Sequence, residues 1–205
     1  MKNKHKIFNI ISIVFGAIAF LTIFLGVAQL FHSEFRETRE YLNEQGIKEW
    51  NVLEPLAKLT GLKTIFGGTF ETSTYGTIKY DFSFMSALPY LFIILGIFAA
   101  VLKLTVKPLN SRYMNIVISL FLIIGAGLFL IQVPAVKLSS ESALSIEEIC
   151  KVIKADLRAN QGLDQYVIVR YALKPTIFNY IAMGAAFIAS ISSIIPFFLE
   201  NQFDE

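Results

Sequence analysis

Few side chains in this chain could do catalytic or metal-binding chemistry. Its 205 residues include two histidines and one cysteine. His5 and His32 lie on either side of a long apolar stretch, so a membrane-spanning stretch would hold them at opposite surfaces of a bilayer. A histidine-based catalytic triad or a metal site with several histidines then cannot assemble. The single Cys150 excludes an internal disulfide and cysteine-rich metal sites, and its apolar neighbours indicate a small core residue.

The acidic residues between positions 34 and 44 are a cluster of candidate metal or acid–base ligands. They recur every three or four residues, which is typical of the solvated face of a helix: Glu34, Glu37, Glu40 and Glu44. A calcium site would need further oxygen ligands, and the sequence identifies none. It also lacks the glycine motifs of phosphate-binding and dinucleotide-binding loops. We therefore predict no catalytic residue, no cofactor and no metal ligand.

The composition indicates a membrane protein of one domain, 1–205. Hydrophobic residues make up 55% of the chain and charged residues 17%, with 19 phenylalanines and a single tryptophan. An ordinary soluble domain of this length is less apolar. The formal net charge of +2 is too small to indicate a nucleic-acid partner, so the expected partner is membrane lipid.

Four stretches are long and apolar enough to cross a bilayer, and none contains a charged residue or a histidine. They are residues 7–30, 84–102, 113–136 and 175–199. A helix needs about 20 apolar residues to span the hydrocarbon core, so we predict a bundle of four transmembrane helices. Without a charge inside these stretches, no intramembrane ion path is indicated. Their polar residues are expected to form hydrogen bonds between helices: Asn9, Gln29, Asn115, Gln132 and Asn179.

The first stretch has an alternative interpretation as a secretory signal peptide. Basic residues precede it, and Gly26-Val27-Ala28 is similar to a small-residue cleavage site. Its 24 residues, however, exceed the roughly 7–15 apolar residues of a signal peptide. We therefore expect a helix that is retained in the membrane.

The loops between the stretches are unequal, which predicts an orientation. Residues 31–83 and 137–174 must lie on one side of the membrane and the short loop 103–112 on the other. Three lysines among the first six residues and three basic residues in the short loop favour the cytoplasm for that second side. The fourth stretch alone favours the reverse, since Arg170 and Lys174 precede it and the acidic tail has no basic residue. The balance predicts a multi-pass cell-membrane protein with both termini in the cytoplasm.

Two segments suggest an internal duplication. Lys6–Ile11 reads KIFNII and Arg112–Val117 reads RYMNIV, so both place an asparagine at the same point of a helix entry. Two tandem helix–loop–helix halves would explain this match. Chance similarity between apolar segments is the alternative.

The first large loop changes from a helical to a strand-like pattern. Ser33–Gly46 is polar and predicts a helix that ends at a glycine. Leu62–Phe66, Thr69–Tyr75 and Gly76–Phe84 then favour short strands, because β-branched and aromatic residues alternate with polar ones. Gly67-Gly68 would suit a hairpin turn between the first two strands.

The second large loop predicts one helix and one strand. Ser145–Gly162 begins with a Ser-x-x-Glu capping box and carries one apolar face, formed by Ile146, Ile149, Cys150, Ile153 and Leu157. Asp164–Leu173 favours a strand that enters the fourth stretch directly.

These elements predict a small extracytoplasmic α+β cap on the bundle, with a short antiparallel or mixed sheet and an amphipathic helix. The strands before the second and fourth stretches are expected to pair with each other. A sheet this small needs its apolar face covered. We expect Ile78, Tyr80 and Phe82 to pack against Ile149 and Ile153.

Two sets of residues are candidate contact sites. Trp50, Thr72 and Tyr75 lie in the first large loop, where they are exposed to a partner if they do not pack beneath the loop. Small residues in the apolar stretches predict a face for close helix packing, within the bundle or against another chain: Ser12, Gly16, Gly26, Gly184, Ala185 and Ser192.

The layout resembles that of claudin-like tetraspan proteins, with four helices and a long, strand-bearing first loop. Trp50 and Gly61-Leu62 match part of their loop signature, but Lys63 stands where its second tryptophan belongs and both cysteines are absent. The resemblance therefore implies the layout and not adhesion or pore formation. The segments IFGGTF (65–70) and YDFSFMSALPYL (80–91) are similar to small uncharacterised membrane proteins of low-GC Gram-positive bacteria, which implies no mechanism.

By elimination, the sequence favours a protein that is not an enzyme and works through protein–protein contacts. It would be an envelope scaffold or an accessory subunit of a membrane complex, with another membrane protein or a second copy as partner. The alternative is a subunit of a small oligomeric channel or transporter. A membrane enzyme is the third and least supported interpretation.

Overall fold

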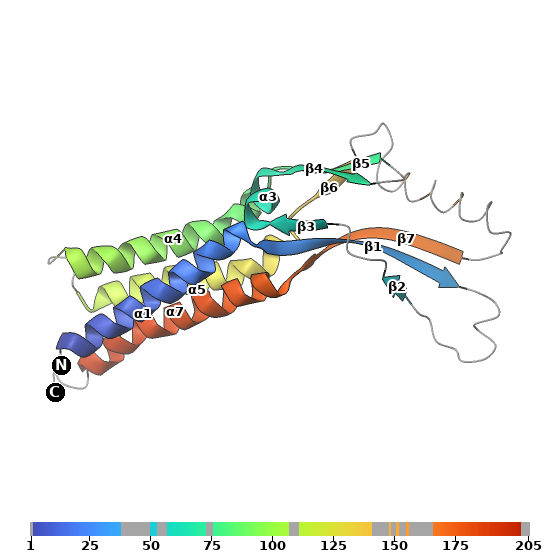
Figure 1. Ribbon diagram of the computed structural model, residues 1–205. Helices are drawn as coiled ribbons and strands as arrows, with labels where there is room; N and C mark the ends of the chain where they lie inside the picture. Colours follow the sequence, from blue (N-terminus) through green and yellow to red (C-terminus); the bar gives the residue numbers. More distant parts are fainter. Residues whose placement is uncertain are drawn as a thin grey trace, which may run out of the picture.

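Four long helices and two small sheets make up the structure, a computed structural model. It describes residues 2–37, 50–52, 57–72, 76–106, 111–140 and 166–201, and also Glu148, Lys151 and Ala155. The sheets lie at one end of the helical bundle, and the ends of the chain lie at the other (Figure 1). The long helices are α1 (Lys2–Leu21), α4 (Phe84–Thr105), α5 (Tyr113–Gln132) and α7 (Ile177–Asn201). Each is long and apolar enough to cross a membrane, as predicted.

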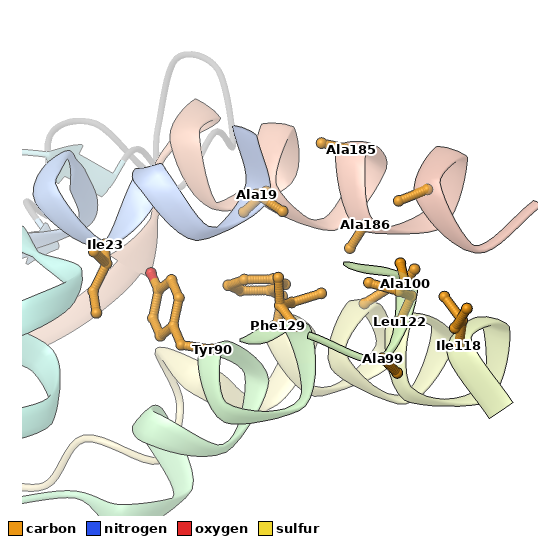
Figure 2. Packing of buried hydrophobic residues seen from close by; sticks show 14 of the residues in the cluster. Ala19, Ile23, Tyr90, Ala99, Ala100, Ile118, Leu122, Phe129, Ala185 and Ala186 are labelled. Carbon is orange, nitrogen blue, oxygen red and sulfur yellow. The ribbon is translucent and has the colours of Figure 1, made fainter. Parts of the chain in front are cut away.

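The four helices enclose one apolar core. α1 and α5 each lie beside both α4 and α7, so α1 and α5 face each other across the bundle. The core combines alanines of α4 and α7 with larger side chains such as Phe129 and Leu122. The rings of Tyr90 and Phe129 meet edge to face, with centroids 5.2 Å apart (Figure 2). The outward faces are apolar as well, which is typical of helices that contact lipid.

The first predicted helix is too long. After α1 and a short 3-10 turn, η1 (Thr22–Phe24), the chain enters strand β1 (Gly26–Glu37). Thr22 Oγ1 donates to the carbonyl of Ala19 at 2.7 Å, and the N–H of Leu25 donates to the carbonyl of Thr22 at 2.9 Å. These bonds tighten and end the helix. Apolar composition could not locate this boundary, because an apolar strand next to an apolar helix has no change in hydropathy.

The strands form two antiparallel sheets. In the first, β1 is central: β7 (Tyr166–Pro175) pairs with one edge of it, and β2 (Trp50–Val52) and β3 (Ala57–Thr60) pair with the other. In the second sheet, β5 (Gly76–Tyr80) lies between β4 (Gly68–Thr72) and β6 (Leu138–Ser140). The strand prediction for Asp164–Leu173 is thus confirmed from Tyr166 onward. Strands were also predicted where β4 and β5 lie, and these two strands pair with each other.

The prediction that the strands before the second and fourth apolar stretches pair with each other is wrong. β5 pairs with β4 and β6, whereas β7 pairs with β1 over ten positions, from Ala28 opposite Pro175 to Glu37 opposite Tyr166. The physical reason is the order of the helices. α1 and α7 are neighbours, so the strands that continue from them emerge side by side (Figure 1).

A disulfide test separates the two pairings. In a chain with Cys150 replaced by alanine, cysteines at Ser33 and Arg170 should crosslink, because these residues are opposite each other in β1 and β7. Opposite residues of antiparallel strands have Cα atoms about 4.5–5.5 Å apart, which suits a disulfide. Cysteines at Phe82 and Val167 should not crosslink. Non-reducing gel mobility measures both pairs, and a bond in the second pair alone would contradict this topology.

The polar segment from Ser33 to Gly46 does not begin as a helix. Residues 33–37 belong to β1, and 38–46 lie outside the described residues. The spacing of the glutamates indicated a helix, but pairing with β7 on one edge and β2 on the other supplies the backbone of β1 with hydrogen-bond partners. Tertiary pairing of this kind overrides local propensity.

The strand predicted at Leu62–Phe66 is instead a short helix, α3 (Gly61–Phe66). Thr60 caps it, since its Oγ1 accepts a hydrogen bond from the N–H of Lys63 at 3.2 Å. Gly67 ends it with a φ of +79°, so Gly67-Gly68 is a helix stop and not a hairpin turn. A Cβ on Gly67 would also lie 2.5 Å from the carbonyl oxygen of Tyr80.

A second apolar cluster holds the two sheets together. Tyr80 of β5 and Leu138 of β6 pack in it with Ala28 of β1, Leu59 of β3 and Leu173 of β7. Burial raises the pKa of the Tyr80 phenol, so this group remains neutral. The predicted core was therefore correct for β5 itself, where Tyr80 and Ile78 are buried.

Phe82 was expected in that core and is 61% exposed. β5 ends at Tyr80, so the alternation of buried and exposed side chains does not continue to Phe82. Its expected partners Ile149 and Ile153 lie outside the described residues. Of the helix predicted at Ser145–Gly162, the structure describes Glu148, Lys151 and Ala155, all helical.

Candidate functional site

A buried lysine lies inside the bundle near the ends of the chain. Lys103 is 3% exposed and belongs to α4, which continues three residues past the predicted end of the second stretch. The prediction ended this stretch at Leu102 and assigned Lys103 to a loop, which is wrong. Lys103 follows the buried residues Gly96, Ala99 and Ala100 at helical spacing, so it faces the same interior side. Its Nζ donates a hydrogen bond to Oδ1 of Asn115 in α5.

Asn9 of α1 lies at the same height in the bundle as Lys103. A Cβ on Gly16 would be 2.9 Å from Cγ1 of Ile97, so α1 and α4 touch at this point. The two helices run in opposite directions (Figure 1). A rise of about 1.5 Å per residue then places Asn9 roughly 10 Å from Gly16 and Lys103 roughly 9 Å from Ile97, both toward the ends of the chain.

We call Asn9, Ser12, Lys103 and Asn115 the polar layer. Their side chains are buried, and Asn9 Oδ1, Ser12 Oγ and Asn115 Nδ2 have no hydrogen-bond partner within the described part of the chain. The three atoms include hydrogen-bond donors and acceptors, and a bound water molecule could form hydrogen bonds with both kinds. Asn9 and Asn115 are also the two asparagines that the proposed internal repeat aligns. A buried ionisable side chain is unusual in apolar helices and commonly has a function.

A second set of buried polar groups closes the bundle at the end next to the sheets. Gln132 Nε2 donates to the hydroxyl of Tyr90 at 3.2 Å and to Oγ1 of Thr64 at 3.4 Å. Ser86 Oγ donates to the carbonyl of Gln132 at 2.9 Å. These bonds join α5 to α4 and to the short helix α3. Between this set and the polar layer lies the apolar core, so the described part of the bundle has no continuous polar path.

The residues predicted to form a helix-packing face do not all do so. Ser12, Ala185 and Ser192 are buried, and Gly16 is in contact with α4. Gly26 lies in β1 and not in a helix, where a Cβ would be 3.3 Å from Cβ of Lys58 on β3. A Cβ on Gly184 would meet no atom within 4 Å.

Gly184 instead borders an apolar groove on the outer surface of the bundle. The groove, of about 320 Å³, lies between α5 and α7 and is lined by Ile123, Ala126, Gly127, Met183, Gly184 and Phe187. Gly127 is as open as Gly184. Two open glycines allow close approach of another helix or of lipid chains.

The candidate partner contacts belong to different sheets. Trp50 is in β2, opposite Phe35 of β1. Thr72 ends β4, opposite Gly76 of β5. Tyr75 lies outside the described residues. The structure therefore does not bring Trp50 and Thr72 into one strand pair.

The sequence prediction missed Lys103 because it was assigned to a loop. The spacing of Gly96, Ala99, Ala100 and Lys103 along one helical face was the signal that could have revealed it. Within the described ranges, no three histidine, cysteine or acidic side chains gather as a metal site would require. Neither the protein-family models, nor the curated proteins, nor the solved structures with which the chain was compared match it.

Proposed function

We propose that the chain is a multi-pass membrane protein that acts without catalysis, by binding a second protein through its two sheets. The observation that carries this proposal is the long β1–β7 ribbon. β1 has 12 residues and a length of roughly 40 Å, and the ribbon extends well beyond β3 and away from the bundle (Figure 1). A ribbon of this length presents a large surface to a partner.

The edge of β7 is the part of the ribbon best suited to binding. On one side β7 pairs with β1, and no other described strand pairs with its second side. A strand edge of ten residues offers a row of backbone donors and acceptors to an extended segment of a partner. The basic residues near the N-terminus and in the short loop support an extracytoplasmic position for the sheets.

The connection of the ribbon to the helices supports a role in transmitting binding to the membrane. Leu25 alone separates η1 from β1, and Thr176 alone separates β7 from α7. Thr176 also donates a hydrogen bond from its N–H to the carbonyl of Val27 at 2.9 Å. Because these connections are so short, a partner that tilts the ribbon would move α1 and α7 as a pair.

The test is capture of the complex from native membranes. A C-terminal tag and mild detergent should recover a stoichiometric second protein, measured by native mass spectrometry. A photo-crosslinking residue at Val169 of β7 should attach to that protein, whereas the same residue at Gly184, in the α5–α7 groove, should not. A complex that crosslinks through Gly184 and never through Val169 or Thr72 would contradict binding through the sheets.

The polar layer favours a second candidate function, a subunit of an oligomeric channel or transporter. Ionisable groups in apolar helices often belong to ion or substrate paths. Because the apolar core separates the polar layer from the sheets, conduction would require several copies, and the Gly184 groove offers a contact between them. Recovery of a symmetric oligomer without a second protein, with ion flux in liposomes that Gly184→Leu abolishes, would favour this function over the first.

A further inference from the structure

Two neighbouring phenylalanines are strongly exposed where the sheets meet the bundle. Phe66, at the end of α3, is 68% exposed, and Phe82, just before α4, is 61% exposed. Their ring centroids are 6.5 Å apart. We call Phe66 and Phe82 the aromatic pair. Exposed aromatic rings that gather in this way usually have a contact partner.

The backbone holds the aromatic pair in a fixed position. The N–H of Ser83 donates to the carbonyl of Ile65 at 2.9 Å, which ties the segment before α4 to α3. The N–H of Gly67 donates to the carbonyl of Lys63 at 3.0 Å and closes the end of α3. Ser83 also caps α4, since its Oγ accepts a hydrogen bond from the N–H of Ser86 at 3.3 Å. The two rings are therefore presented by bonded structure and not by a loose loop.

The surroundings of the pair favour lipid as its partner. Phe84 and Met85, in the first turn of α4, are also exposed, and the outward face of α4 continues apolar through Leu91, Ile94 and Phe98. The aromatic pair thus extends the surface that α4 would present to a bilayer. A protein partner would have to contact both the aromatic pair and the outward face of α4 that continues from it.

Exposed polar residues lie close to the pair in the sequence. Lys63, one turn before Phe66, is exposed, and Lys79 and Asp81 form an exposed ion pair at 3.8 Å. A short helix that exposes a phenylalanine together with a lysine, as α3 exposes Phe66 and Lys63, is suited to lie at the level of lipid headgroups. α3 itself is amphipathic: Thr64 and Ile65 are buried against the protein, and Lys63 and Phe66 face outward.

We propose that the aromatic pair inserts into the interfacial layer of the bilayer at the end of the bundle that carries the sheets. α3 then lies on the membrane surface and fixes the height of the second sheet above it. This proposal requires that α4 crosses the membrane, but it does not depend on a protein partner for the ribbon.

Tryptophan fluorescence in lipid vesicles tests the proposal. Trp50 is the one tryptophan of the chain, so the Trp50→Phe variant has no tryptophan fluorescence and serves as the background for new tryptophans. Phe66→Trp and Phe82→Trp are made separately in it, with Lys79→Trp as a control expected in water and Phe98→Trp as a control expected deep in lipid. Each full chain is reconstituted in phosphatidylcholine vesicles with spin-labelled lipids that carry the quencher near the headgroup or near the bilayer centre.

The expected result is a distinct order of quenching. Phe66→Trp and Phe82→Trp should show blue-shifted emission and stronger quenching by labels near the headgroup than by labels near the centre. Phe98→Trp should show the reverse, and Lys79→Trp should respond mainly to iodide in the water. The proposal is overturned if both substituted positions respond to iodide as Lys79→Trp does. It is also overturned if both are shielded from iodide and from lipid labels, because a protein surface would then cover them.

Discussion

The Gly61→Ala variant is expected to be less stable than the natural chain by about 3 kcal/mol, the upper part of the usual range for an overpacked core. Gly61 begins α3 where this helix rests on the end of η1. A Cβ there would lie 2.7 Å from Cα of Ile23 and 2.5 Å from the hydroxyl of Tyr90. The first contact is with backbone, which cannot rotate away. The thermal midpoint of the detergent-solubilised protein should fall accordingly.

Gly127→Ala is the matched control for this change. A Cβ on Gly127 would meet no atom within 4 Å, and alanine is the better helix former by about 1 kcal/mol. The midpoint of this variant should stay the same or rise. If Gly61→Ala has the midpoint of the natural chain, then α3 is not seated against η1 as described.

The Asn115→Leu variant is expected to lose about 1.5–3 kcal/mol of stability, the range for a hydrogen bond to a charged group. Leucine is close to asparagine in size, so the main change is the removal of the carboxamide oxygen that accepts from Lys103 Nζ. A buried ammonium that loses an acceptor raises the free energy of the folded state. Lys103→Met in the same chain should recover most of the loss, because the thioether side chain needs no acceptor.

The natural chain, the two single variants Asn115→Leu and Lys103→Met, and the double variant form a double-mutant cycle. Their stabilities are compared by thermal midpoints at neutral pH. A coupling energy between Asn115 and Lys103 well above zero is expected. Strictly additive effects would show that Asn115 does not stabilise the Lys103 charge. The cycle is informative even if each single variant is only moderately unstable, since it compares differences.

The helices could be predicted because their signal is long and local. About 20 apolar residues without a charge have few alternatives to a membrane-grade helix, and all four were located. Their ends could not be placed as well. Residues 26–30 are as apolar as α1, but they form a strand because β7 and β3 supply hydrogen-bond partners for their backbone.

Strand pairing depended on information that no local pattern contains. The strand character of β5 and β7 was visible in their alternation and in their β-branched residues. Which strands become neighbours follows from the packing of α1 against α7, and that packing is decided by interior faces far apart in the chain. α3 was missed for a related reason, because a six-residue helix between two strands depends on its caps, Thr60 and Gly67, more than on its composition.

The candidate site residues were likewise predicted only in part. Asn9 and Asn115 were recognised as polar groups at membrane depth, and Asn115 does form a bond between helices. Lys103 was missed because it was assigned to the loop 103–112, where a charge is usually solvated. Phe82 was misplaced because the alternation of a strand was extended past the residue where the strand ends.

The register of β1 with β7 also constrains the order in which the protein can be completed. β1 is among the first segments to be synthesised, and its ten-residue partner begins at Tyr166, after three of the four long helices. Until α7 is in place beside α1, one edge of β1 has no native partner, and an unpaired strand edge is prone to wrong association. The last helix therefore serves as the step that closes the first sheet, and a chain arrested before β7 would carry an open β1 edge at the end of the bundle.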